Sequence, residues 1–141
     1  MSKEILNFMK SHLGYTDDEM KMFMENPKNI EVLKRAPTLM NKTIVIEVVA
    51  SHGCNSQHKV GEKFYFDGFG NLITKLCPKR ICISALGAAE KLIYAADALM
   101  FADQNPNEML FNRVGCSDIG LKCGGWGNIV MEIKVIDRKK D

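Results

Sequence analysis

Apolar residues recur at helical spacing through residues 1–42, which predicts three short helices there. Ser2 is placed to cap the first of them. The second begins with a capping box, because the hydroxyl of Thr16 can accept the N–H of Glu19 while the glutamate reaches back to the cap. The third is expected to end before Pro37, since a proline disfavours helical geometry in the residue that precedes it.

The pattern then changes from helical spacing to the alternation of strands. Residues 43–50 (TIVIEVVA) are rich in β-branched residues, and residues 128–136 (NIVMEIKVI) alternate, so both predict strands. Shorter strands are expected at 63–66 and 109–114. Between them, a long apolar helix should run from Pro78 or slightly later to about residue 101.

This order of elements predicts an α+β protein. Residues 1–42 would form an N-terminal helical cap, and residues 43–141 a small ββαββ domain. In that domain one long buried helix would pack on an antiparallel or mixed sheet.

Composition and charge narrow the class of protein. A chain of 141 residues with 46% hydrophobic and 26% charged residues fits one globular domain. The net charge of +2 gives no basic stripe for nucleic acid, and the basic end 138–140 is expected to be a frayed tail. The most apolar run contains Glu90, Lys91 and Asp97, and no secretory signal opens the chain. These features predict a cytoplasmic protein with no membrane span.

Five cysteines in a reducing compartment are not expected to form structural disulfides. Cys54 and His58 have a C-x3-H spacing on a polar loop, and such a spacing can place both side chains on one metal ion. The spacings differ from those of zinc fingers and bacterial ferredoxins. The sequence nevertheless favours a zinc or iron–sulfur site, with metal-free thiol chemistry and plain burial as alternatives. The candidate ligands are Cys54, His58, Cys77, Cys82, Cys116 and Cys123.

The stretch KLCPKRICISAL at 75–86 is the part of the sequence on which the alternative of metal-free thiol chemistry depends. If Pro78 occupies the first helical position, Cys77 becomes the helix cap and its thiol should ionise readily beside the free N–H groups. Lys79 and Arg80 would add to that positive field. If the helix instead begins near residue 81, Cys82 joins the same cluster.

The segment 43–136 resembles a family of small prokaryotic proteins known only as an uncharacterised repeat protein. The resemblance lies in Cys54, in His58-Lys59-Val60-Gly61-Glu62 with Phe64, and in Cys116. The family's middle element, C-P-x-A-L, is divided here between Cys77-Pro78 and Cys82 with Ala85-Leu86. The resemblance implies a fold relation and a set of residues, with the N-terminal helices as an extension found in a longer subgroup, but no activity.

These candidate residues suggest two roles for residues 43–141. The sequence leaves open whether the protein is an enzyme. One is a metal or iron–sulfur protein, redox-active or accessory to a larger enzyme. The other is a metal-free enzyme that acts on a small anionic substrate, with His58 as base and Cys77 as the candidate catalytic thiol. The helical cap could dock on a larger enzyme or on a second copy of the chain. Asp118 and Trp126 are weaker candidates, as an orienting acid and a pocket wall.

Overall fold

The structure is a computed structural model that describes residues 3–138. The chain divides into two compact units, Met1–Ala36 and Pro37–Asp141, called here the helical unit and the core unit. The predicted cap residue Ser2 and the basic residues Lys139 and Lys140 lie outside the described part.

The helical unit contains α1 (Lys3–Leu13), α2 (Asp17–Glu25) and the start of α3 (Pro27–Met40). The predicted capping box is confirmed: Thr16 Oγ1 accepts the Glu19 N–H at 3.2 Å, and Glu19 Oε2 accepts the Thr16 N–H at 2.9 Å. These two bonds satisfy N–H groups that have no partner inside α2, which explains where the helix begins.

The expected end of α3 before Pro37 is wrong, because the helix continues to Met40. Leu39, in the last turn, is fully buried in the core unit. Its carbonyl also lies so close to Gly68 that a side chain at that position would meet it at 1.8 Å. We attribute the continued helix to this burial, which outweighs the local cost of the proline.

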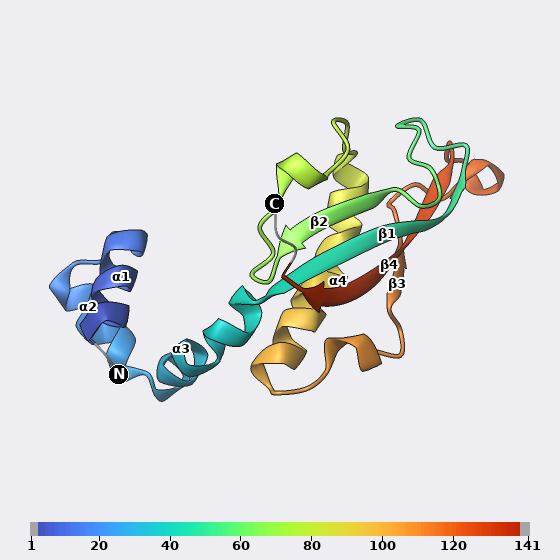
Figure 1. The fold of residues 1–141 in the computed structure, drawn as a ribbon. Coiled ribbons are helices and arrows are strands. Elements are labelled where there is room, and N and C mark those ends of the chain that lie inside the picture. Colours follow the sequence, from blue (N-terminus) through green and yellow to red (C-terminus); the bar gives the residue numbers. More distant parts are fainter. Residues whose placement is uncertain (1–2, 139–141) are drawn as a thin grey trace. The chain divides into compact units, whose positions relative to one another are not determined.

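The core unit is built on a four-stranded antiparallel sheet in the order β2-β1-β4-β3 (Figure 1). The strands are β1 (Lys42–His52), β2 (Lys63–Asp67), β3 (Arg113–Gly115) and β4 (Asn128–Asp137). The long central pair β1–β4 carries most of the sheet, and its register shifts at a bulge between Val48 and Ala50.

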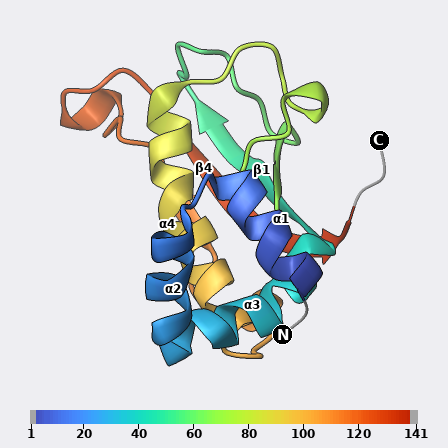
Figure 2. The same cartoon turned by 90° about the vertical axis from the view of Figure 1, so that its left-hand side faces the viewer.

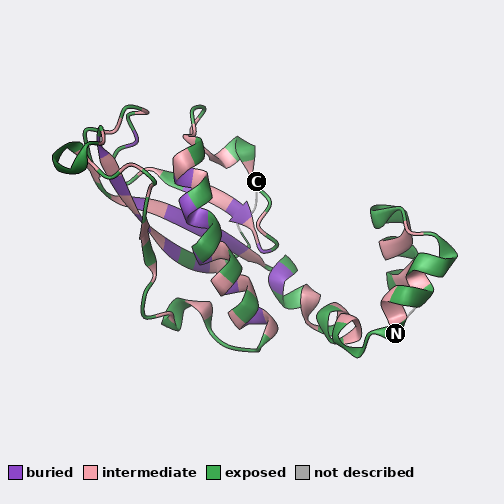
Figure 3. Ribbon diagram, turned by 180° about the vertical axis from the view of Figure 1, so that it is seen from behind, coloured by how far each residue is buried: buried purple, intermediate pink, exposed green. Residues whose placement is uncertain are grey.

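One long helix, α4 (Ile83–Phe101), packs on one face of this sheet (Figures 1 and 2). Alternate residues of β2 and β4 are buried, as are Ile44, Ile46 and Val48 of β1, and Figure 3 colours the buried residues purple. Thr43 and Val45 of β1 are buried as well. The small residues Ala85, Ala89 and Ala96 allow the helix to approach the sheet closely. The buried strand residues of this core are Ile44, Ile46, Val48, Phe64, Phe66, Ile129, Met131, Ile133 and Val135.

The predicted α+β class, the helices before the sheet and the long helix are therefore confirmed. One boundary distinguishes two alternatives, and another differs from the prediction. The helix begins at Ile83, which agrees with the alternative start near residue 81 and not with a start at Pro78. The strand expected at 109–114 is reduced to β3, preceded by the 3-10 helix η2 (Pro106–Glu108). Two further 3-10 turns are η1 (Thr74–Leu76) and η3 (Leu121–Cys123).

Candidate functional site

All five cysteines belong to three segments of the core unit, residues 53–62, 77–83 and 116–127, which we call together the sulfur end. A chain of contacts joins them. The Cys116 Sγ accepts the Ile129 N–H at 3.4 Å, and Ile129 pairs with Ser51 across β1 and β4. The hydroxyl of Ser51 donates to the carbonyl of His58 at 2.6 Å. In Figures 1 and 2 the loops after β1 and around η3 lie at the end where α4 begins.

His58 is the buried centre of the sulfur end, with an exposed fraction of 2%. Its Nδ1 lies 2.8 Å from Glu62 Oε1, and its Nε2 accepts the backbone N–H of Cys82 at 3.1 Å. Because Nε2 accepts a bond, the network assigns the proton to Nδ1, which donates to the carboxylate. Both ring nitrogens are thus used inside the protein, so a base or ligand role for His58 would require one of these bonds to break.

Cys82 is the N-cap residue of α4. The side chain of Ser56, from the loop after β1, lowers the pKa of the Cys82 thiol by hydrogen bonding to it, and this is the largest effect. Burial opposes it, while the backbone N–H groups of Ser84 and Ala85 lower the pKa further. A thiol placed at the positive end of a helix is in the setting that favours the thiolate.

Cys77 does not cap the long helix, so the prediction that its thiol ionises readily is wrong. It follows η1 and lies beside β2, where its Sγ accepts the Tyr65 N–H at 3.2 Å and faces the Tyr65 carbonyl at 3.5 Å. Burial raises the pKa of Cys77, and the bond with Tyr65 only partly offsets this. The thiol therefore completes the backbone hydrogen bonding of β2 rather than the start of α4.

The other cysteines differ in burial. Cys54 and Cys116 are half-buried and pack against the core, as Cys82 does, whereas Cys123 is exposed within η3. The side-chain amide of Asn128 lies 3.7 Å from Cys116 Sγ, in addition to the backbone N–H of Ile129. All five cysteines are free thiols. Within residues 3–138, no three His, Cys, Asp or Glu side chains are arranged to hold a metal ion.

Asp118 acts as a clamp on the loop before β4, which the sequence did not reveal. Its Oδ1 accepts the N–H groups of Gly120 and Trp126 at 2.9 Å each, and its Oδ2 accepts that of Gly127 at 3.2 Å. These three hydrogen bonds lower the pKa of Asp118, and the bond from the Gly120 N–H has the largest effect. Gly127 has no room for a side chain, because a Cβ would lie 2.0 Å from the Gly53 carbonyl. The glycines thus let two loops of the sulfur end touch.

The surface of the sulfur end combines exposed apolar side chains with exposed cations. Trp126 is 71% exposed, so it does not form the wall of a closed pocket. The other exposed apolar residues of these segments are Val60, Ile83, Ile119 and Leu121. The exposed cations are Lys59, Lys79, Arg80 and Lys122.

A separate hollow of about 670 Å³ lies on the face of the sheet opposite α4. It is lined by apolar residues such as Val45 and Tyr65 and by charged ones. Two of its acids are paired, since Glu47 lies 3.7 Å from Lys63 and Glu132 lies 2.8 Å from Arg113.

No family model, curated protein or solved structure matches this chain. The resemblance to the uncharacterised prokaryotic family therefore stays a prediction. Among the described residues, no helix has the length and apolar character needed to cross a membrane.

Proposed function

We propose that the sulfur end is a thiol-dependent catalytic site whose nucleophile is Cys82. The observation that carries this proposal is the position of the Cys82 thiol, at the N-cap of a 19-residue helix and beside the side chain of Ser56. The thiolate is the nucleophilic form of cysteine, and this setting stabilises it. Cys77, bonded to β2 with a raised pKa, is the weaker candidate.

His58 acts in this proposal as a positioning residue. Its bond to the Cys82 N–H holds the cap against the loop that carries Ser56. In the reaction, the Cys82 sulfur forms a bond to an electrophilic carbon of the substrate, and the leaving group departs with the electron pair of the bond that breaks.

The substrate class follows from the surroundings of Cys82. Lys79 and Arg80 are exposed in the segment that leads into α4, and the helix N-terminus favours negative charge. Ile83, next to Cys82, is 79% exposed. These features support a small substrate with an anionic group and an apolar part.

Alkylation of each cysteine by iodoacetamide over a range of pH, read by peptide mass spectrometry, tests the proposal. The apparent pKa from each profile separates ionisation from accessibility, and that of Cys82 should be the lowest. Ser56→Ala should raise it and slow alkylation at neutral pH several-fold, since a hydrogen bond contributes about 1 kcal/mol. Ser117→Ala, an exposed serine, is the matched control. Equal profiles for all five cysteines would overturn the proposal.

We propose as a second candidate that Cys54, Cys82 and Cys116 bind zinc or an iron–sulfur cluster, in a role that is redox-active or accessory to a larger enzyme. The observation that favours it is the N–H donors on Cys116, because hydrogen bonds to sulfur are a common feature of thiolate metal sites. The three thiols would need to move closer together to share an ion, and thiolates suit both zinc and iron–sulfur clusters.

Metal analysis with an absorption spectrum, on protein purified without oxygen, tests the second candidate. Cys54→Ser and Cys116→Ser should each lower the metal content, whereas Cys123→Ser, at an exposed thiol, should not. A metal content that none of these substitutions changes would contradict it.

A further inference from the structure

The exposed cations of the sulfur end have no charged partner in the described part of the chain. No ion pair among residues 3–138 includes any of these four side chains, which are Lys59, Lys79, Arg80 and Lys122. The same segments contain two acids, and both are bound internally. Glu62 is bound by His58 and by the Lys59 N–H, and Asp118 by three backbone N–H groups. The four cations are therefore available to an external anion.

Exposed apolar side chains lie next to these cations in each of the three segments. Val60 follows Lys59, and Ile83 follows Arg80 closely in the sequence. The loop 116–127 contains Lys122 together with the exposed residues Ile119, Leu121 and Trp126. Figures 1 and 2 place the loop after β1 and the loop around η3 at the end of the core unit where α4 begins. Apolar and cationic groups thus share this end.

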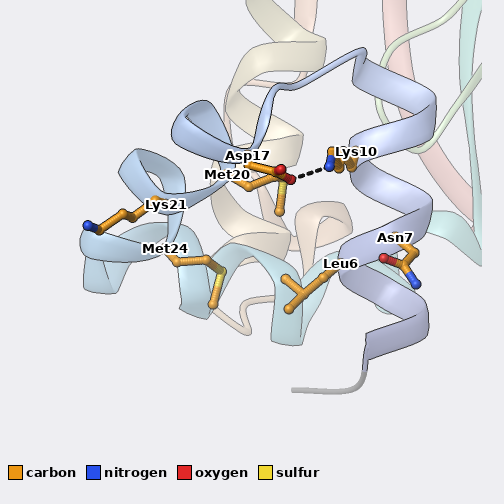
Figure 4. Close-up of a pocket in the computed structure, with 7 residues that line it drawn as sticks. All are labelled: Leu6, Asn7, Lys10, Asp17, Met20, Lys21 and Met24. Atoms are coloured by element: carbon orange, nitrogen blue, oxygen red, sulfur yellow. Dashed lines mark hydrogen bonds and ion pairs between the residues drawn. The ribbon is translucent and has the colours of Figure 1, made fainter.

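Two hollows elsewhere in the molecule differ from this surface, because charges of both signs line them. Figure 4 shows the groove of about 250 Å³ between α1 and α2, where Leu6, Met20 and Met24 lie near the ion pair of Lys10 and Asp17. The hollow on the open face of the sheet is lined by acids and lysines alike. The sulfur end instead presents apolar side chains with exposed charge of one sign.

The residue types of the sulfur end indicate what kind of partner it binds. Three of its four exposed cations are lysines, which are depleted in protein–protein interfaces but attract anionic phospholipid headgroups. Four of its five exposed apolar residues are aliphatic, whereas single-stranded nucleic acids are bound by stacking on aromatic side chains. The fifth is Trp126, and tryptophan is enriched at the level of lipid headgroups. This composition favours a bilayer over a protein or a nucleic acid.

We propose that the sulfur end docks on the surface of a bilayer that contains anionic phospholipids. The apolar residues of the loop 116–127 enter the headgroup region, while the four cations bind anionic lipid groups. The hydrogen bonds to Asp118 hold this loop in place before contact, so that binding requires little further ordering. The contact is peripheral and needs no membrane-crossing helix. This inference goes beyond the proposed function and does not rest on it, since no thiol takes part.

Sedimentation of the full chain with vesicles tests the proposal. Vesicles of phosphatidylcholine mixed with phosphatidylserine should bind the protein, and vesicles of phosphatidylcholine alone should bind it much less. Added salt should weaken the binding, because it screens exposed charges. Trp126 is the single tryptophan of the chain, so its fluorescence emission should move to shorter wavelength on the mixed vesicles. Protein that stays in the supernatant, or an emission spectrum that does not move, would overturn the proposal.

A pair of charge reversals tests the role of the cations. Lys59→Glu with Lys122→Glu should lower the partition coefficient on the mixed vesicles by roughly thirtyfold or more, as expected for the loss of two basic residues near an anionic bilayer. Lys91→Glu with Lys134→Glu, at two exposed lysines outside the sulfur end, gives the same net charge and is the matched control. Its effect should be much smaller.

A pair of polar substitutions tests the apolar contact. Ile119→Ser with Leu121→Ser should lower the partition coefficient by roughly tenfold or more, because less apolar surface leaves water. Leu110→Ser with Phe111→Ser, at residues 92% and 91% exposed outside the sulfur end, should leave it unchanged.

The comparison of test and control pairs decides where the protein binds. Equal losses in both would overturn the proposal and assign the contact to another surface. A chain that binds polyglutamate or single-stranded DNA but not the mixed vesicles would overturn it as well, and would favour an acidic protein or a nucleic acid as partner. Circular dichroism of each variant would show that the core unit remains folded.

Discussion

At the scale of single residues, the burial of the Asp97 carboxylate works against folding at neutral pH. Asp97 lies on α4 and, among the described residues, its Oδ1 is a buried oxygen with no hydrogen-bond partner. Burial raises its pKa from 3.8 to about 6, and repulsion by Asp67 contributes as well. The folded state therefore holds the proton more tightly than the unfolded chain. This contribution to stability is fully present below pH 3.8 and is lost as the pH rises through about 6.

We predict that Asp97→Asn stabilises the protein at pH 7 by about 1 kcal/mol, a value reduced from the full shift because the group is half exposed to screening solvent. The gain should disappear below pH 3.8, where the carboxyl is protonated in both states. Urea denaturation at the two pH values measures it. Glu90→Gln, at an exposed acid on the same helix, is the control. A gain of equal size at both pH values would contradict the assignment.

A second prediction at this scale concerns the substitution of His58. Replacing it by Leu removes both ring bonds and leaves the Glu62 carboxylate and the Cys82 N–H without their partner. The free energy of unfolding should fall by roughly 2–3 kcal/mol, as is typical when buried polar groups lose their partners. His52→Leu, at an exposed histidine, should change it by less than about 0.5 kcal/mol. Denaturation midpoints with an unchanged slope would measure both. Equal, small effects would show that His58 is not structural.

At the scale of elements, two glycines with ordinary φ values predict opposite effects of the same substitution. Gly87 lies exposed in α4, and a Cβ there meets nothing within 4 Å. Gly87→Ala should stabilise the protein by about 0.5–1 kcal/mol through helix propensity. Gly68→Ala should destabilise it by about 1–3 kcal/mol, because its Cβ would lie 1.8 Å from the Leu39 carbonyl. Thermal unfolding of both variants measures the pair, and a shift of the same sign in both would contradict the packing argument.

The strands and the long helix could be predicted from the sequence because their signal is local. Alternation in β1 and β4 and the apolar run of α4 each lie within one element. The sequence left two starts of α4 open, near Pro78 and near residue 81, because the contact that distinguishes them is not local: the Cys82 N–H is accepted by His58, 24 residues earlier. For the same reason α3 passes Pro37, as the burial of Leu39 depends on tertiary packing.

The candidate site was predictable only in outline. Polar neighbours identified the loops that carry Cys54, Cys77 and Cys116, but not the partner of each sulfur atom. Cys77 and Cys82 are five residues apart, and burial and hydrogen bonding shift their pKa values in opposite directions. That difference arises from Tyr65 and Ser56, which belong to other segments. Asp118 was a candidate orienting acid, but its role as a loop clamp could not be predicted, because its partners are backbone N–H groups up to nine residues away.

At the scale of the whole molecule, the two units should differ in local stability. The core unit contains the buried residues of the sheet and α4, whereas none of the described residues before Pro37 is buried. Backbone amides open more readily where few apolar groups are buried around them. We therefore predict that amides of α1 and α2 exchange with deuterium faster than those of β1, β4 and α4.

Hydrogen exchange read by mass spectrometry of peptides from each element measures this difference. Amides of β1 and β4 serve as the internal reference, because their hydrogen bonds pair the two long central strands of the sheet. Protection of α1 and α2 equal to that of β1 and β4 would contradict the prediction that burial sets local stability in this chain.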